Sequence, residues 1–377
     1  MVLIQLWLCI VACHAPEKAV ESAPPGDTWG DSAVWETDWE VPACDAVSGS
    51  SALTWTLDAG LSVAPSDGEV EANTAVTAIL PLSQAGQVLA VHDGALYRSA
   101  DAGCTWSSEA LPDGQNRTLV AGPGDIVWGW SGSLDTLLRI EGDAVELRAA
   151  PDVDLVGLGV DAVNPELLRA GDDGCDIWQS ADGGETWALL FEAPVDTLSA
   201  HAVVFDPDDV DHLLCAQTHE GVWVSVNGGD RWDQGRGLTT SGELTGFDAR
   251  FVPGERDVVW MHALYPGEGV RDAIFRSTDG GVSWEEALVE GAGLGEGVSI
   301  DSDAPIAVHP GAPNVLAFAG GTTLYTYDAR AEALTANAAF AEHEIQAIAA
   351  SPAAPGTWYL GFGDSAFAAR PSSVKSR

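Results

Sequence analysis

The sequence predicts an all-β protein: a single seven-bladed β-propeller of four-stranded blades, closed by an N-terminal strand. Three observations lead to this fold: regularly spaced prolines, the β-prone apolar runs around them, and an octapeptide that recurs at one phase of the repeat. The composition agrees, because 42 Gly and 15 Trp against 2 Met favour turns and strands over helices.

The first repeat signal is a series of prolines with successive spacings of 42, 42, 42, 46, 57 and 42 residues. Its members are Pro81, Pro123, Pro165, Pro207, Pro253, Pro310 and Pro352. Each follows an apolar run such as HAVVFD (201–206), and further β-prone runs come after it. Because proline cannot donate to a β-ladder, it belongs at a strand end. The period therefore predicts one four-stranded propeller blade per unit.

The two ends of the repeat region are predicted to share the last blade. The final unit starts near Glu344 and is too short for four strands, whereas Ala52–Leu57 precedes the first unit and has no repeat of its own. Pairing them would remove the exposed sheet edges. We therefore assign 51–371 to the propeller and 372–377 to a C-terminal tail. A linear solenoid, the competing fold, would need caps that the sequence does not contain.

The N-terminus is predicted to be an export signal. The apolar run Val2–Ala12 is shorter than the roughly 20 residues that span a bilayer and fits a signal-peptide core. Residues 10–13 resemble a bacterial lipobox, so we expect 1–13 to be a lipoprotein signal ending at the lipidated Cys13, although its start lacks Lys and Arg. Residues 14–50 form an acidic Pro/Ser-rich tether. We expect a lipid anchor at the bacterial outer membrane or cell surface, or otherwise secretion.

Four cysteines remain beyond the signal, an even number suited to an oxidising compartment. Three pairings are open to them. We prefer Cys44–Cys104 and Cys175–Cys215, because the repeat register places each pair in neighbouring elements. No CxxC motif supports zinc.

The second repeat signal is the octapeptide S-x-[DN]-x-G-x-x-W, which occurs four times. We expect Asp or Asn to accept backbone hydrogen bonds in a tight turn, Gly to supply a positive φ and Trp to cover the hairpin. Its positions are therefore assigned to folding. They are Ser99, Asp101, Gly103 and Trp106; Ser180, Asp182, Gly184 and Trp187; Ser225, Asn227, Gly229 and Trp232; and Ser277, Asp279, Gly281 and Trp284.

These octapeptides resemble the Asp-box, or bacterial neuraminidase (BNR) repeat, of sialidases, sortilin-type propellers, two-propeller xyloglucanases and photosystem II assembly-factor-like proteins. The resemblance covers residues 75–370 and implies that the box lies away from the ligand face. The F/Y-R-I-P motif of sialidases is absent, and Arg98, Arg139 and Arg276 are predicted on solvated sheet faces. The xyloglucanase cleft lies between two propellers, whereas one is expected here.

One rim of the predicted propeller is the expected ligand face. The starts of the inner strands and the loops between second and third strands meet there, and long loops on rigid scaffolds often bind ligands. The candidates are His92, Arg117, Asp172, Asp173, His201, His219, Glu220, Arg250, Tyr265, Glu268 and His343. No catalytic residue could be assigned.

The charge limits the partners. With 16 Lys and Arg against 57 Asp and Glu, the net charge of −41 repels nucleic acid and anionic lipid, so membrane contact is expected through the lipid anchor only. His212, Cys215 and His219 straddle a strand, so we predict no metal centre and no cofactor. Calcium binding at the acidic turns 172–176 and 206–211 is left open.

We therefore predict a monomeric, non-catalytic binding or scaffolding propeller tethered to the envelope or cell surface, with a protein or glycan partner. The alternative is an extracellular carbohydrate-active enzyme: a glycoside hydrolase, a sialidase-like enzyme or a lyase.

Overall fold

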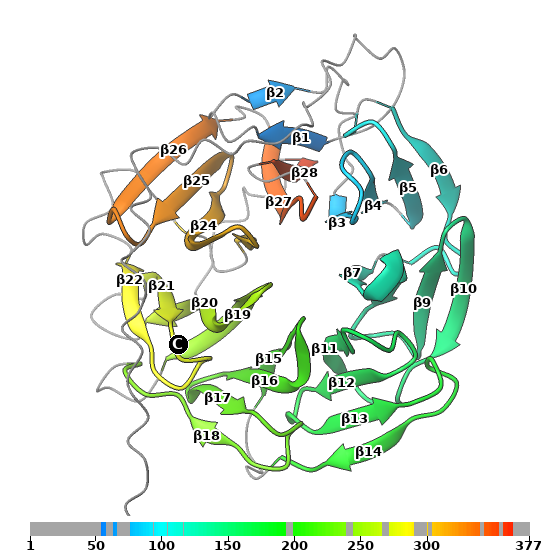
Figure 1. The fold of residues 1–377 in the computed structure, drawn as a ribbon, viewed down its shortest axis with the longest axis horizontal. Helices are drawn as coiled ribbons and strands as arrows, with labels where there is room; N and C mark the ends of the chain where they lie inside the picture. Colours follow the sequence, from blue (N-terminus) through cyan, green and yellow to red (C-terminus); the bar gives the residue numbers. More distant parts are fainter. Residues whose placement is uncertain are drawn as a thin grey trace, which may run out of the picture. The chain divides into compact units, whose positions relative to one another are not determined.

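The computed structural model describes residues 54–57, 63–65, 76–92, 94–103, 105–115, 117–193, 199–238, 244–265, 271–289, 300, 304–339, 343–353 and 357–364. These residues belong to one compact unit, 35–377, and form four-stranded antiparallel sheets (Figure 1). The helical element within these ranges is a short 3₁₀ turn, η1 (Pro123–Asp125). No membrane-spanning helix is found among them.

Six sheets are blades built from four consecutive strands. Blade 1 contains β3 (Val76–Pro81), β4 (Val88–His92), β5 (Ala95–Ser99) and β6 (Ser107–Ala110). Blade 2 contains β7 (Thr118–Ala121), β8 (Val127–Trp130), β9 (Thr136–Glu141) and β10 (Ala144–Ala149). Blade 3 contains β11 (Leu155–Val160), β12 (Leu168–Asp172), β13 (Ile177–Ser180) and β14 (Ala188–Phe191).

The other three blades have the same strand order. Blade 4 contains β15 (Ala200–Asp206), β16 (Asp209–Gln217), β17 (Gly221–Ser225) and β18 (Asp233–Gln234). Blade 5 contains β19 (Thr245–Val252), β20 (Glu255–Tyr265), β21 (Arg271–Ser277) and β22 (Glu285–Val289). Blade 6 contains β23 (Ile306–His309), β24 (Ala312–Gly320), β25 (Thr323–Asp328) and β26 (Ala333–Ala339).

The fold prediction needs a correction at the remaining sheet, here called the closing sheet. Seven equivalent units completed by one N-terminal strand were expected, but among the described residues six units are continuous four-strand blades. The closing sheet has the order β2–β1–β28–β27, with β27 (His343–Ala350) and β28 (Trp358–Asp364) from the C-terminal part. Its outer half consists of two N-terminal strands, β1 (Thr54–Leu57) and β2 (Val63–Pro65). The C-terminal repeat supplies half a blade, so a single added strand would leave it incomplete.

The first strands of successive sheets contact one another in a closed order. Strand β3 contacts β7, and the contacts continue through β11, β15, β19, β23 and β27 back to β3 (Figure 1). Each of these inner strands ends near a proline of the repeat series or at the turn that contains it. The inner strands therefore bring residues far apart in sequence next to each other at the centre.

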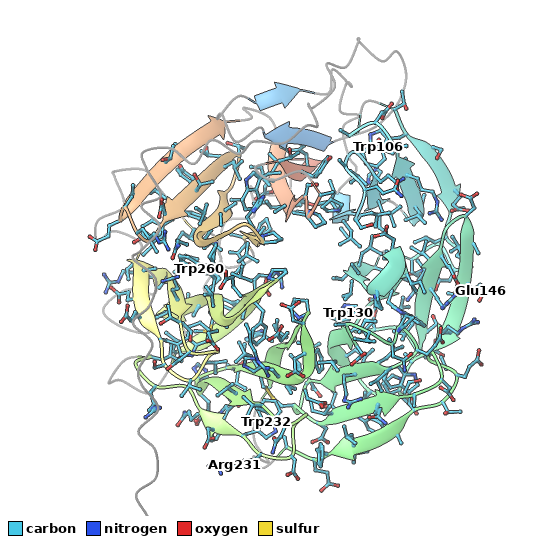
Figure 2. The ribbon with its side chains drawn as sticks, viewed as in Figure 1. Trp106, Trp130, Glu146, Arg231, Trp232 and Trp260 are labelled. Atoms are coloured by element: carbon cyan, nitrogen blue, oxygen red, sulfur yellow. A yellow bond between two sulfur atoms is a disulfide. The ribbon has the colours of Figure 1, made fainter. Side chains whose placement is uncertain are left out.

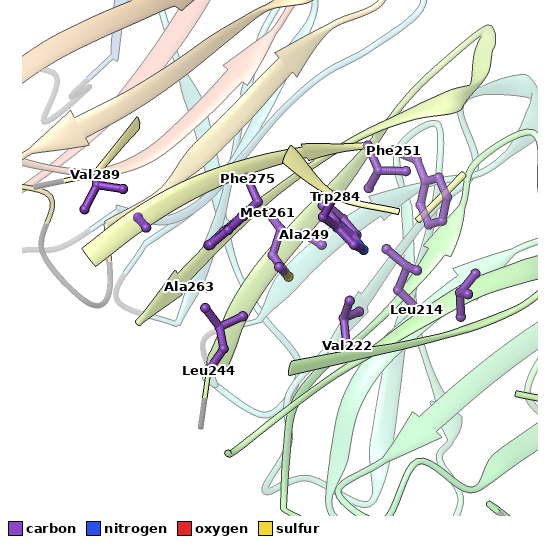
Figure 3. Packing of buried hydrophobic residues seen from close by; sticks show 13 residues of the cluster. Leu214, Val222, Leu244, Ala249, Phe251, Met261, Ala263, Phe275, Trp284 and Val289 are labelled. Carbon is purple, nitrogen blue, oxygen red and sulfur yellow. The ribbon is translucent and has the colours of Figure 1, made fainter. Parts of the chain in front are cut away.

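The core lies in the seams between neighbouring sheets. In the seam between blades 4 and 5, Leu214 and Val222 pack with Phe251, Met261 and Trp284, as Figure 3 shows. All five are nearly inaccessible to solvent. Burying a large apolar side chain contributes about 1.5–3 kcal/mol, so the seams are the main source of stability.

The four octapeptides form the same hydrogen-bonded turn. In blade 5, Ser277 Oγ accepts the Gly281 N–H at 2.8 Å and donates to Asp279 Oδ1 at 2.9 Å. Asp279 Oδ1 also accepts the Ser283 N–H at 2.7 Å. In blade 3, hydrogen bonds from the hydroxyl and N–H of Thr186 lower the pKa of the Asp182 carboxyl to about 2.

Third-strand arginines were expected on solvated faces, and the structure corrects this. The Arg139 guanidinium lies 5.9 Å from the Trp128 ring and donates to Glu166 of the next blade at 3.2 Å. Arg276 lies over Trp260 at 5.4 Å and donates to Asn314 of the next blade. Arg98 donates to the Gly142 carbonyl of blade 2 at 2.8 Å. These side chains connect blades because the stem of an arginine covers apolar surface while its head reaches polar groups.

Gly157 provides a direct test of the inner ring. A Cβ at this position would lie 1.8 Å from the carbonyl oxygen of Val203 in the neighbouring blade. We expect Gly157→Ala to lower the free energy of unfolding by about 2–3 kcal/mol, because overpacking forces the backbone to shift. Denaturant unfolding measures this. Gly174→Ala in the same blade, whose Cβ would meet only Asp172 Oδ1 at 3.3 Å, should cost far less. Equal losses would contradict close packing of β11 against β15.

Candidate functional site

Bulged residues at the starts of the inner strands determine where the site lies. The strand register shifts between Ala200 and Ala202 in β15 and between Gly246 and Asp248 in β19. The extra residues are His201 and Phe247, and bulges re-aim side chains next to functional sites. Their rings meet across the seam between blades 4 and 5, with centroids 5.2 Å apart.

Behind these rings is a buried His–Asp pair. His262 Nε2 lies 2.9 Å from Asp272 Oδ1, and only 1% of the His262 side chain and 11% of the Asp272 side chain are exposed. An ionised carboxylate accepts hydrogen bonds only, so Nε2 carries the proton. The His262 ring also lies 5.6 Å from Phe247.

Asp248 completes this group, which we call the rim cluster: His201, Phe247, Asp248, His262 and Asp272. Asp248 lies opposite His262 in the β19–β20 register. Its carboxylate accepts a hydrogen bond from Arg250 Nη1 at 2.6 Å, and 26% of its side chain is exposed.

Burial raises the pKa of the Asp248 carboxyl above its ordinary value, although Arg250 and His262 act in the opposite direction. A carboxyl that keeps its proton to higher pH is suited to general acid catalysis.

His201 is held in one tautomer. Thr218 Oγ1 donates to the Ser199 carbonyl at 3.0 Å, so its contact with His201 Nε2 at 3.0 Å requires the imidazole to donate. Burial lowers the pKa of His201, which favours the neutral ring at pH 7. The residue is exposed, and in this tautomer Nδ1 is the ring nitrogen that can accept a hydrogen bond.

The rim cluster can therefore bind polar ligands and exchange protons. It combines two imidazoles, a carboxyl with a raised pKa and an aromatic ring. Across the described ranges, no group of three or more His, Cys, Asp and Glu side chains is arranged to hold a metal ion.

Several predicted ligand-face residues perform structural tasks instead. Arg117 is buried, pairs with Asp113 and donates to the Thr136 carbonyl at 2.6 Å. His92 is buried at the end of β4. Asp172 accepts the N–H groups of Gly174 and Asp176 and the Trp178 Nε1–H at 2.9–3.0 Å, and burial raises the pKa of its carboxyl.

Other predicted residues remain available on this rim. Asp173, His219 and Glu220 are exposed in the β12–β13 and β16–β17 turns, and His219 has a left-handed φ of 66°. Tyr265 and His343 occupy strand ends. The Tyr265 and His343 side chains, together with Glu268, Cys13, Cys44 and Cys104, lie outside the described residues.

The possible ligand set His212, Cys215 and His219 is divided by the strand. His212 contacts Asp206 Oδ2 at 3.0 Å and the Gly280 carbonyl at 2.8 Å in the following blade. Cys215 forms a disulfide with Cys175 in the preceding blade, which is the predicted pairing. The two side chains therefore occupy opposite faces of β16.

Sequence reasoning named His201 and Arg250 but missed four members of the rim cluster: Phe247, Asp248, His262 and Asp272. They lie within or at the start of ordinary strands and belong to no motif. The available signal was alternation, which places Asp248 on the same strand face as Arg250.

Asp248→Asn tests whether burial of the ionised Asp248 carboxylate destabilises the folded protein. In the unfolded chain it ionises near pH 3.8, whereas the folded protein keeps the proton to higher pH. Folding thus becomes less favourable as pH rises through that interval, so the variant should have a higher Tm than wild type at pH 7 and no advantage below pH 3.8.

Thermal unfolding at both pH values measures this effect. Asp173→Asn, at an exposed position on the same rim, controls for the loss of one charge from an acidic protein. A gain at pH 7 no larger than that of the control would contradict the proposed burial penalty.

Comparisons with known proteins support a propeller and identify a relative. A scan against protein-family models finds no match. The chain is 32% identical over 343 residues to the "Dispase autolysis-inducing protein" of Streptomyces mobaraensis, which covers 86% of this chain and 89% of that protein.

Two solved structures are similar in fold. The GH74 xyloglucanase from Xanthomonas campestris is 18% identical with a TM-score of 0.58 over 78% of this chain, which spans about half (51%) of that enzyme. The structure of YCF48 bound to D1 peptide is 14% identical with a TM-score of 0.56, covering 86% of this chain and all of that chain (100%). At these identities the likeness shows the propeller fold alone.

Proposed function

The chain belongs to the family of the dispase autolysis-inducing protein, and from this we propose that it is a non-catalytic binding propeller whose partner is a protein. The observation that carries the proposal is the length of the match. It extends over most of both chains, so the similarity includes most of the propeller of this chain and is not confined to an isolated motif. The relative's name refers to a protease, which makes a protease the first partner to test.

The charge and location expected from the sequence fit this proposal. A protein with a net charge of −41 attracts positively charged partner surfaces and speeds encounter with them. Exposed Asp173 and Glu220 present that charge on the rim. As part of the proposal, a lipid on Cys13 would hold the propeller at the envelope.

The proposal is tested with the full chain carrying Cys13→Ser, which prevents lipidation, and with dispase as the probe. We expect saturable binding to an inactivated dispase and faster self-cleavage of active dispase, followed by surface plasmon resonance and gel electrophoresis. The Streptomyces relative is the positive control. If the relative acts on dispase while this chain neither binds it nor alters its cleavage, a protease partner is excluded for this chain.

A second candidate, a carbohydrate-active enzyme, is favoured by one observation. Asp248 has a raised pKa and lies opposite the buried His262–Asp272 pair, an arrangement that could protonate a leaving group. Glycoside hydrolysis commonly needs paired carboxyls about 5–10 Å apart.

A reducing-end assay on envelope glycans distinguishes the two functions. The binding proposal expects no release of reducing ends. Turnover that disappears in Asp248→Asn, while the variant remains folded, would establish the enzyme instead.

A further inference from the structure

A cavity of about 600 Å³ lies between blades 1 and 2. Blade 1 contributes Arg98, Trp106 and Ser107 to its walls, and blade 2 contributes Ile140 and Asp143. The cavity also borders η1 and the octapeptide turn of blade 1. We call it the seam groove. The rim cluster contributes nothing to its lining.

In four other seams between sheets, a tryptophan of the octapeptide occupies the position that corresponds to the seam groove. Every blade that has the octapeptide packs its Trp against the preceding sheet. Trp187 Nε1 donates to the Ala149 carbonyl of blade 2 at 2.9 Å, and Trp284 packs with Val222 of blade 4. Trp232 packs with Ile177 of blade 3. Trp106 packs beside the closing sheet. Trp106 and Trp232 are labelled in Figure 2.

Blade 2 has no octapeptide and therefore no Trp to insert between itself and blade 1. Its β9 and β10 are joined directly at Gly142 and Asp143. The buried cluster of this seam consists of Ala, Leu, Val and Ile side chains in the part of the chain that the structure describes. Blade 6 also lacks the motif, but Trp260 and Tyr327 meet in its seam with blade 5 at a ring distance of 6.2 Å. The seam groove is thus a position to which blade 2 contributes no aromatic ring, and its indole lining comes from Trp106 of blade 1 alone.

Most polar groups of the groove form hydrogen bonds within the protein. Arg98 donates to Glu109 at 2.9 Å and to the Gly142 carbonyl at 2.8 Å. Asp125 accepts the N–H and hydroxyl of Ser83. Asp143 is exposed at the groove edge, and no hydrogen bond or ion pair of its side chain occurs within the described ranges. The groove therefore combines rigid walls with an acidic edge.

We propose that the seam groove binds an aromatic side chain, Trp or Tyr, from a loop of the protein partner, with an adjacent Lys or Arg that pairs with Asp143. The packing argument is that this fold accepts an indole at the equivalent place in four seams. The charge argument is that the groove edge and the whole chain are acidic. A buried aromatic anchor beside a cation is a common hot-spot chemistry. The inference rests on the proposed binding function and names the recognition element.

The test uses N-acetyl-Trp-Lys-amide as probe, with N-acetyl-Ala-Lys-amide and N-acetyl-Trp-Glu-amide as controls, in NMR titrations of the full chain carrying Cys13→Ser. We expect the Trp-Lys probe to bind at least fivefold more tightly than either control. Ser107→Phe, at an exposed position on the groove wall, should abolish that binding. Ala188→Phe is the matched control, because Ala188 is exposed and follows Trp187 as Ser107 follows Trp106, and the seam of its blade with blade 4 contains Trp232. It should bind like wild type.

Asp143→Asn gives a second variant at an exposed position should Ser107→Phe unfold. It should remove the preference for Lys over Glu while leaving binding of the indole. Equal binding of all three probes, or unchanged binding by both variants, overturns the proposal. Preferential binding of a glycan by the groove also overturns it. The tether 14–50 contains Trp39, and tighter probe binding after Trp39→Ala would overturn the proposal by showing that the tether, and no partner, occupies the groove.

The same variants distinguish an incorrect groove proposal from an incorrect binding function. If Ser107→Phe binds dispase like wild type, the groove is not the recognition site although the binding function stands. If wild type binds the Trp-Lys probe but not dispase, the groove stands as an aromatic-cation site and the protease partner is wrong.

Discussion

Face-to-face packing of neighbouring sheets is the interaction on which the rest of this structure depends. Each blade is too thin to bury its own apolar side chains, so one sheet supplies half of the core of the next. The inner strands approach so closely that Gly157 has no room for a Cβ beside Val203. Because the contacts of β27 with β3 complete the circle, no sheet face is left at an open end.

This packing also creates the rim cluster. His201 and Phe247 are 46 residues apart in sequence, yet both are bulge residues on adjacent inner strands, and their rings meet. The bulges free these side chains from the alternation of the strand, while the pairing of β19 with β20 holds Asp248 opposite His262. The rim cluster therefore stands on rigid elements, and such elements hold functional groups more accurately than loops do.

The octapeptides explain both the regular seams and the irregular one. Their serine and acidic side chains close a turn, and their tryptophan fills the space beside the preceding blade. Where the motif is missing, the seam is either refilled, as by Trp260 and Tyr327, or left hollow, as between blades 1 and 2. The absence of this structural motif from blade 2 thus accompanies the hollow seam between blades 1 and 2.

The sequence by itself determined the strand and turn rhythm and the octapeptide turns, and it favoured the Cys175–Cys215 pairing, because each depends on residues within one repeat or on the register between successive repeats. It did not reveal that Val63–Pro65 adds a second outer strand to the closing sheet, since a three-residue strand carries no periodic signal. Likewise, only the tertiary structure joined Asp248 to His262 and Asp272 and showed that Arg117 is buried. These outcomes depend on strand bulges and on the distance between sheets. Both are set by how whole blades pack, and a single strand's sequence contains neither.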